Sequence, residues 1–155
     1  MTSTSDTDRI ERSILIAATR ERVWRALTDS AQFGAWFGVD FGAHAFEPGR
    51  RMTGPFTLPG CEGLRFDAVI DRIEAQQSMS LRWHPYAVDM ATDYSHEEPT
   101  LVTFTLADAP GNGILLTVVE SGFDKVPAAR RRQAFEKNGN GWDAQLRNIA
   151  AYVSK

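Results

Sequence analysis

Apolar and polar residues alternate along several short stretches in the middle of the chain. In residues 64–71, apolar positions such as Phe66 and Ile70 are separated by positions that are mostly charged, and residues 79–84 repeat the pattern. A period of two is typical of strands with one face toward a core. Strands are therefore expected over residues 9–17, 39–46, 50–58, 64–73, 79–84, 100–107 and 114–121.

Glycine and proline separate these strands and indicate how they are connected. Segments 59–63 and 108–113 have the composition of turns, so consecutive strands are expected to pair antiparallel. Pro55 restricts the strand over 50–58 to a sheet edge or a bulge. The polar, acidic segment 85–99 is long for a hairpin connection, and loops of this length are often functional or mobile.

Two short helices are expected between the first two strands. Apolar residues four positions apart predict a helix over residues 20–29, and Thr19 precedes it as a potential N-cap. A second helix is expected over residues 31–37. It should end at Gly38, because glycine readily adopts the left-handed conformation that closes helices.

The C-terminal segment has a clear helical pattern. Apolar or small residues follow one another at alternating spacings of four and three positions: Phe135, Gly139, Trp142, Leu146, Ile149 and Val153. This spacing places them on one side of a helix from Pro127 to Val153, which would be about 40 Å long. One long amphipathic helix beside an antiparallel sheet predicts an α+β fold in which the helix covers the apolar face.

The composition is ordinary for a globular protein and narrows the classes of function. The 155 residues suit one domain, expected over residues 9–155 after a disordered polar tail at residues 1–8. The formal net charge of -3 does not favour nucleic-acid binding. No secretory signal is recognisable, and no apolar run approaches the roughly 20 residues of a membrane-spanning helix. Cys61 is the only cysteine, and we expect a cytoplasmic protein.

Several residues near the two ends of the chain resemble a known family. They are Glu21 to Thr28 (ERVWRALT), Phe33 to Phe37 (FGAWF), the pair Gly141-Trp142, Leu146 and Ile149. In these motifs the chain resembles the SRPBCC, or START-like, superfamily. More narrowly, it resembles the family named after the C-terminal domain of the activator of the heat-shock protein 90 ATPase. The resemblance extends over about residues 9–153.

The resemblance implies a helix-grip fold, in which a curved antiparallel sheet of about six to seven strands surrounds the long C-terminal helix. It also implies a cavity between sheet and helix, where members bind lipids, hormones, polyketides or other apolar molecules. Some related families are cyclases or hydratases. The named co-chaperone has an additional N-terminal domain for which this chain has no room, so the heat-shock role carries over poorly.

Candidates for the lining of such a cavity come from the expected inner faces: Trp36, Phe66, Trp83, Trp142 and Leu146. Pockets for small ligands are mostly apolar and aromatic. The same residues also suit a filled core, so both interpretations stay open at this point. Arg82 and His84 alternate with Trp83 and should face away from a cavity that Trp83 faces.

Glu120 is the acidic residue of greatest chemical interest. It shares a strand face with Ile114, Leu116 and Val118. One interpretation is that its carboxylate points into the cavity and anchors a ligand or acts as an acid, which makes it a weak catalytic candidate. A second is that the strand reaches solvent at Glu120, and a third is that Arg82 pairs with it.

The remaining chemistry-bearing residues do not predict a further site. The acidic residues of segment 85–99 have no metal-ligand spacing, and neither a metal nor a cofactor is expected. Gly139 and Gly141 each cost roughly 1 kcal/mol in a helix. This cost indicates either close packing of Trp142 against the sheet or a kink that gives a ligand access.

Three functions are compatible with these observations, in order of preference. The first is the binding of an apolar or amphipathic small molecule in the cavity, without turnover. The second is a polyketide cyclase- or hydratase-like enzyme that uses Glu120, with Arg82 or His84 beside it. The third is an interaction module with a chaperone as its partner, which rests on analogy of fold alone. A homodimer is compatible with each.

Overall fold

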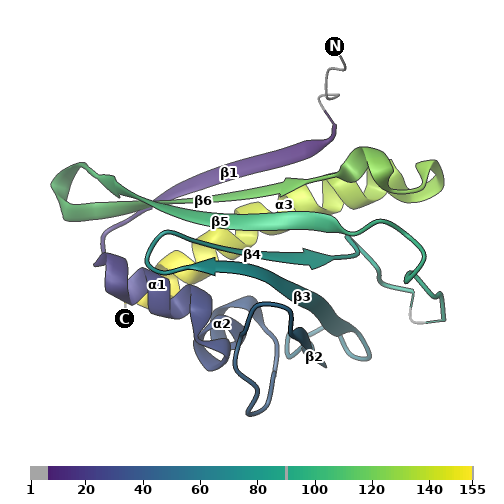
Figure 1. Ribbon diagram of the computed structural model, residues 1–155, viewed down its shortest axis with the longest axis horizontal. Helices are drawn as coiled ribbons and strands as arrows, with labels where there is room; N and C mark the ends of the chain where they lie inside the picture. Colours follow the sequence, from purple (N-terminus) through teal and green to yellow (C-terminus); the bar gives the residue numbers. More distant parts are fainter. Residues whose placement is uncertain (1–6, 90, 155) are drawn as a thin grey trace.

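The centre of the molecule is one curved antiparallel sheet of six strands (Figure 1). The computed structural model describes residues 7–89 and 91–154. The strand order is β1-β6-β5-β4-β3-β2, so β1 and β2 form the two edges. The strands are β1 (Arg9–Ile16), β2 (Arg51–Pro55), β3 (Arg65–Glu74), β4 (Ser78–Trp83), β5 (Thr100–Ala109) and β6 (Gly113–Ser121).

Helix α3 (Ala128–Val153) runs along one side of the sheet (Figure 1). Its buried residues form one stripe: Ala134, Gly139, Trp142, Leu146, Ile149 and Val153. Pro127 stands at the N-cap, where its missing N–H costs nothing. The spacing of four and three is confirmed as one long helix, and the curved sheet around it has the expected α+β helix-grip arrangement.

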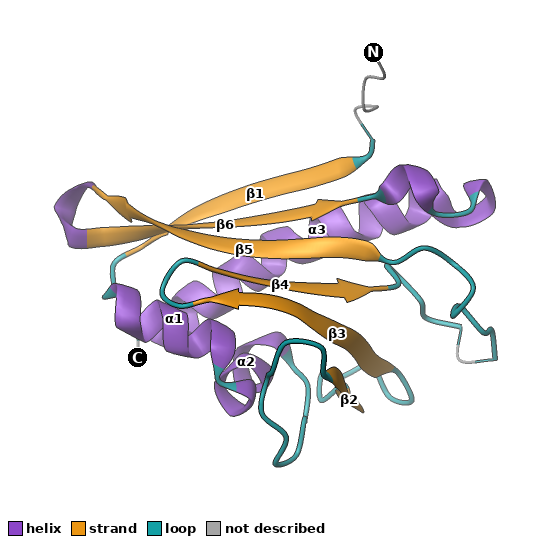
Figure 2. Cartoon of the chain, in the orientation of Figure 1, coloured by secondary structure: helices purple, strands orange, loops and turns teal. Residues whose placement is uncertain are grey.

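Helices α1 (Arg20–Thr28) and α2 (Ser30–Phe37) follow β1 and contact each other and α3. Thr19 is the N-cap of α1, since its hydroxyl oxygen accepts a hydrogen bond from the backbone N–H of Arg22 (3.1 Å). Gly38 closes α2 in the left-handed conformation, with φ 94°. Both helices lie at one end of the sheet, next to the C-terminal end of α3 (Figure 2).

The expected strand over residues 39–46 is wrong, because this segment is irregular apart from one isolated bridge at Val39. Its buried side chains, among them Val39 and Phe41, gave the sequence the appearance of a period of two. Asp40 instead accepts a hydrogen bond at Oδ1 from the backbone N–H of Gly42 (2.9 Å). This side-chain turn bends the backbone out of an extended course.

Strand β2 forms an edge of the sheet, as Pro55 requires, and pairs with β3. The irregular segment before β2 passes directly over this strand. A Cβ at Gly54 would lie 2.1 Å from the carbonyl oxygen of Asp40, so only glycine fits at this crossing.

Residues 1–6 of the expected N-terminal tail lie outside the described residues. The carbonyl oxygen of Asp8 accepts hydrogen bonds from the backbone N–H groups of Gly122 (3.1 Å) and Phe123 (3.0 Å). These bonds attach the start of β1 to the short 3-10 helix η2 (Phe123–Lys125) after β6. A second 3-10 helix, η1 (Pro110–Asn112), connects β5 to β6.

Aromatic rings fill the core between the sheet and the two short helices. Phe33 is fully buried and has six ring neighbours, with centroids 4.7–6.2 Å away: Trp36, Phe37, Phe41, Phe46, Phe66 and Phe104. Burial of each such side chain contributes ~1.5–3 kcal/mol. Phe37 and Phe66 also belong to the wall of the pocket described next.

Candidate functional site

A pocket of about 1240 Å³ lies between the β2 edge of the sheet and the middle of α3. Its walls come from α2, β2, β3, β4 and α3, together with the loop between β2 and β3 and the loop that follows β4. Small-molecule sites usually have ~300–1,000 Å³. The larger volume here reflects an outer part that reaches round the sheet edge, because both inward Phe66 and outward Asp67 line it.

Four aromatic side chains form the inner wall of the pocket. Trp83 from β4 and Trp142 from α3 stack, with ring centroids 5.7 Å apart and planes 26° apart. Phe66 from β3 packs edge-on against Trp83 (5.7 Å). Phe37 from α2 lies 5.5 Å from Phe66 and 6.2 Å from Trp142. The wall therefore exists only when two strands and two helices are assembled.

Glu120 from β6 lies behind this wall and is 0% exposed. Its Oε1 accepts a hydrogen bond from Trp142 Nε1 (2.9 Å), and its Oε2 accepts one from Trp83 Nε1 (2.7 Å). Thr100 Oγ1 donates to Oε2 (2.6 Å), and Asn138 Nδ2 donates to Oε1 (2.9 Å). An indole N–H can only donate, so one carboxylate fixes the orientation of both indole rings.

These four donors occupy the carboxylate of Glu120. A carboxylate has about four lone-pair sites, so this arrangement leaves none for the proton of a substrate. Burial of Glu120 also means that β6 has not reached solvent at this position. Arg82 does not pair with Glu120, since its guanidinium pairs with Asp71 instead (3.4 Å). Glu120 is not among the residues that line the pocket.

Polar side chains interrupt the aromatic lining at a few positions, among them Asn138 and Gln145 from α3 and His84 after β4. Gln145 Nε2 donates to the carbonyl oxygen of Phe37 (3.0 Å), which ties α3 to α2. Gly141 also lines the pocket, and a Cβ there would meet no atom within 4 Å. The two glycines of α3 thus differ, because a Cβ at Gly139 would lie 3.2 Å from Arg12 Nη2.

Exposed apolar side chains gather at the outer part of the pocket. Among the described residues, the large hydrophobic side chains that are exposed are Leu15 (68%), Leu58 (43%), Val88 (40%) and Val69 (39%). Three of them, Leu58, Val69 and Val88, line this pocket. A cluster of this kind is typical of a surface that another molecule covers.

Charged side chains lie at the same outer part. Arg51 pairs with Asp67 through Nη2 and Oδ2 (2.6 Å), and this hydrogen bond and charge raise the pKa of Arg51. Arg65 also lines the pocket and has no ion-pair partner among the described residues. These groups are exposed, so their interactions are weakened by water.

The loop between β4 and β5 is held to α3 by Arg130. The guanidinium pairs with Glu97, with Nε–Oε1 at 3.0 Å, and donates through Nη1 to the carbonyl oxygen of Pro85 (2.6 Å). It also lies 4.8 Å from the ring centre of Tyr94. The side chains of Arg130 and Glu97 are 18% and 8% exposed. We call this set of contacts the Arg130 latch.

Carboxylates also shape this loop from within. Asp89 accepts hydrogen bonds from Thr92 Oγ1 (2.7 Å) and the backbone N–H of Ala91 (3.0 Å), which lower the pKa of Asp89. Asp93 accepts one from the backbone N–H of Ser95 (2.9 Å), and the pKa of Asp93 is lowered by hydrogen bonding to Ser95. Both acids therefore stabilise local turns in the loop.

The structure separates the six residues that the sequence proposed for the cavity. Phe66, Trp83 and Trp142 line the pocket, and Glu120 lies behind the two indoles. Trp36 and Leu146 are buried outside the lining. Trp36 Nε1 donates to the carbonyl oxygen of Ala26 (2.8 Å) and so joins α2 to α1.

Sequence reasoning missed Phe37, Asn138 and Gln145 as lining residues. The sequence places Phe37 in a short helix and in the family motif Phe33 to Phe37, neither of which indicates a pocket. A polar residue between buried positions of an amphipathic helix is a usable signal, because Asn138 lies four positions before Trp142 and thus on the same side.

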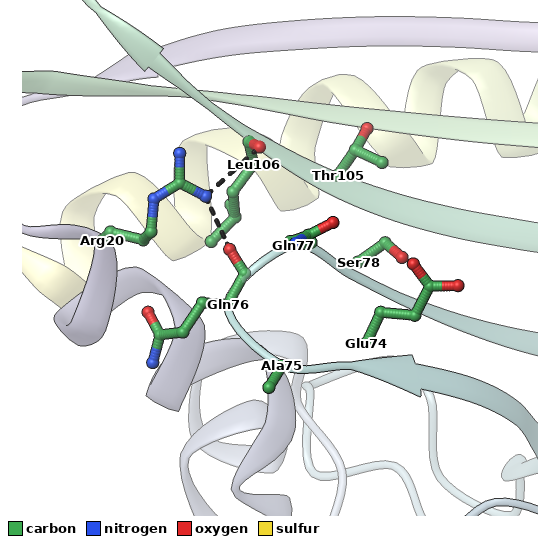
Figure 3. A pocket seen from close by; sticks show the side chains of 8 residues that line it. All are labelled: Arg20, Glu74, Ala75, Gln76, Gln77, Ser78, Thr105 and Leu106. Carbon is green, nitrogen blue, oxygen red and sulfur yellow. Dashed lines mark hydrogen bonds between the residues drawn. The ribbon is translucent and has the colours of Figure 1, made fainter.

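A second pocket, of about 570 Å³, lies at the turn between β3 and β4 (Figure 3). Arg20 from α1 reaches into it and donates through Nη1 to the carbonyl oxygens of Gln76 (2.6 Å) and Leu106 (3.4 Å). Its Nη2 pairs with Asp108 (2.9 Å). These contacts attach α1 to the sheet, so we assign Arg20 a structural role.

Residues 7–89 and 91–154 contain no cluster of side chains suited to a metal ion. Within this part of the chain, no three His, Cys, Asp or Glu side chains are grouped so that they could hold one. Nor does any helix in it combine the length and apolarity needed to cross a membrane.

Comparison with known proteins adds a family match. The profile of the family described as "Activator of Hsp90 ATPase homolog 1-like protein" matches residues 17–154. A search of curated proteins gives no significant match.

Solved structures show the same fold. Protein MLL2253 from Mesorhizobium loti is 24% identical, with a TM-score of 0.72 over 94% of this chain and 96% of that chain. A protein from Arthrobacter aurescens is 19% identical, with a TM-score of 0.74 over 97% and 90%. DynU16, from the dynemicin biosynthetic locus, is 21% identical, with a TM-score of 0.69 over 96% of this chain and 48% of that chain. This chain thus spans about half the length of DynU16.

Proposed function

Because the chain belongs to the Activator of Hsp90 ATPase homolog 1-like family, within the SRPBCC superfamily, we propose that it binds an apolar or amphipathic small molecule in the pocket beside α3. The observation that carries this proposal is the position of the apolar surface. Phe66, Trp83 and Trp142 form one wall, and three of the exposed large hydrophobic side chains lie on the same pocket. An aromatic wall with few polar groups is typical of small-molecule sites.

Binding without turnover fits the chemistry of the pocket better than catalysis by Glu120. A general acid or base must come within hydrogen-bond distance of the reacting proton. The oxygens of Glu120 already accept from Trp83, Trp142, Thr100 and Asn138. We therefore propose that Glu120 positions the aromatic wall, which is a role in binding rather than in a reaction.

Native mass spectrometry of the protein purified from its host tests the proposal directly. The expected result is a stoichiometric small molecule that is released on denaturation. In NMR spectra, its binding should shift the indole N–H signals of Trp83 and Trp142, whose rings line the pocket. A protein that is empty, and stays empty after soaking with lipids and aromatic compounds, contradicts the proposal.

Protein interaction is the second candidate function, and the exposed apolar side chains at Leu58, Val69 and Val88 favour it. The family description refers to an activator of the Hsp90 ATPase, so a chaperone is the partner to test first. Pull-down with the purified chaperone, with Val88→Asp as the matched variant, separates the two functions. The interaction function is favoured if the wild-type protein binds the chaperone but no small molecule, and if Val88→Asp no longer binds the chaperone.

A further inference from the structure

Asn138 carries an amide whose orientation is determined by Glu120. Its Nδ2 lies 2.9 Å from Oε1 and 3.2 Å from Oε2 of that carboxylate. A carboxylate that receives two indole N–H groups acts as an acceptor, so the amide must turn its NH₂ group toward it. The other amide atom, Oδ1, then faces away from Glu120. Within the described part of the chain no group donates to Oδ1, and Asn138 lines the pocket.

His84 offers a second acceptor to the same pocket. Its Nε2 lies 3.0 Å from the carbonyl oxygen of Glu97. A carbonyl oxygen can only accept, so Nε2 carries the hydrogen, and Nδ1 of the neutral ring is left as an acceptor. Residues 7–89 and 91–154 provide no hydrogen-bond donor to Nδ1.

The third polar side chain, Gln145, is already engaged at both ends of its amide. Gln145 donates through Nε2 to Phe37, and its Oε1 accepts from Asn148 Nδ2 (3.0 Å). The pocket therefore offers one acceptor at Asn138, beside the aromatic wall, and another at His84. A ligand that buries an ether or a bare ring there leaves these acceptors unpaired, which costs binding energy.

On this basis we propose that Asn138 is a specificity-determining residue that selects aromatic ligands bearing a hydroxyl or another hydrogen-bond donor. The inference rests on the proposed binding function and adds the chemical class of the ligand. The hydroxyl would donate to Asn138 Oδ1 while the ring lies against Trp83 and Trp142. Because Glu120 holds the amide in place, little ordering is needed when the ligand binds.

An anionic ligand is the main competing class, because Arg51, Arg65 and Arg82 also line the pocket. These side chains are exposed, and two of them already pair with Asp67 and Asp71. Exposed ion pairs contribute little. Asn138 lies one helical turn before the buried Trp142 and shares its carboxylate partner, so a hydroxyl ligand is favoured over a carboxylate there.

The test uses three naphthalenes of similar size: 2-naphthol, 2-methoxynaphthalene and 2-naphthoate. Calorimetric titration of the full chain is expected to give 2-naphthol the highest affinity. Its advantage over 2-methoxynaphthalene should be roughly five- to tenfold, as for one hydrogen bond. In Asn138→Ala this advantage should fall below about twofold, whereas the exposed neighbour variant Asn140→Ala should keep it.

The outcomes separate this inference from the proposed function. If none of the three compounds binds, the binding function fails and the inference fails with it. Equal affinity for 2-naphthol and 2-methoxynaphthalene in the wild type, or a preference for 2-naphthoate, overturns the inference alone. These wild-type comparisons stand even if Asn138→Ala does not fold. If His84→Ala removes the preference and Asn138→Ala keeps it, the assignment to Asn138 is wrong.

Discussion

The indole rings of Trp83 and Trp142 stack 5.7 Å apart, and both donate a hydrogen bond to the same carboxylate, Glu120. One indole comes from a strand of the sheet and the other from α3. The carboxylate thus connects the two layers of the fold at the wall of the pocket. Its oxygens accept from four donors, and no polar atom of a buried side chain among the described residues lacks a hydrogen-bond partner.

Replacement of Glu120 by glutamine should destabilise the protein although the shape of the side chain is unchanged. The new NH₂ group must face a donor, and an indole N–H cannot turn to accept. One buried donor without a partner costs ~1–3 kcal/mol, so we expect a loss of about 2 kcal/mol in the free energy of unfolding. Urea titration followed by tryptophan fluorescence measures it.

Asp143→Asn is the matched control for Glu120→Gln. Asp143 pairs with Arg12 (3.0 Å), and both side chains are partly exposed. Loss of such a pair changes stability by less than ~1 kcal/mol. Equal effects of the two substitutions would show that the buried carboxylate has no special role in holding the wall.

Most of the fold was predictable, because strands and helices leave different periods in the sequence. The stripe from Phe135 to Val153 predicted α3, and the family resemblance based on motifs such as Gly141-Trp142 is confirmed by the match over residues 17–154. The strand expected over 39–46 failed because buried loop residues mimic a period of two.

The candidate site was less predictable, because its contacts join residues that are distant in sequence. Alternation along β6 placed Glu120 on an apolar face. It did not reveal that Trp83 and Trp142, 37 and 22 positions away, both donate to it. Trp36 is equally apolar in sequence, yet its N–H bonds to Ala26 away from the pocket. Only the packing of the strands against α3 separates lining residues from core residues.

The glycine at 141 can be tested by substitutions of two sizes. Gly141→Ala should stabilise the protein by ~0.5–1 kcal/mol, since alanine favours a helix and its Cβ meets no atom within 4 Å. Gly141→Leu should fold but place its side chain in the pocket and lower the affinity for an aromatic ligand at least about tenfold. Thermal unfolding and calorimetric titration measure the two effects.

Gly139 gives the contrast for this prediction. A Cβ there would lie 3.2 Å from Arg12 Nη2, so the helical gain is offset by displacement of that side chain. We expect Gly139→Ala to gain less stability than Gly141→Ala and to leave ligand affinity unchanged. A Gly141→Leu variant that binds ligand as well as the wild type would place the ligand elsewhere.

The Arg130 latch should control the loop over residues 85–99. In Glu97→Gln the guanidinium keeps its contact with Pro85 but loses its charged partner in a mostly buried position. Removal of one partner there should cost about 2 kcal/mol. Limited proteolysis should show faster cleavage within the loop, and urea titration should show lower stability.

Arg132→Gln is the control for the latch. Arg132 pairs with Glu136 on the surface of α3, and these side chains are 91% and 61% exposed. Such a pair contributes ~0.3–0.5 kcal/mol, so this variant should resemble the wild type in both measurements. Unchanged cleavage of the loop in Glu97→Gln would show that Arg130 does not hold it.

Acidification should loosen the same loop before the sheet unfolds. Hydrogen bonds from Thr92 and Ala91 lower the pKa of Asp89 in the folded chain, and contacts with Ser95 lower that of Asp93. A lowered folded pKa means that the stabilisation is complete above the unfolded pKa of about 3.9 and is lost as the pH falls through the folded pKa. The free energy of local opening, measured by amide hydrogen exchange at Ala91 and Ser95, should therefore be constant from pH 5 to 7. It should decrease below about pH 4. Asp89→Asn should remove the acid-induced change at Ala91 and leave that at Ser95, whereas a change that persists at Ala91 in this variant would assign it to another acid.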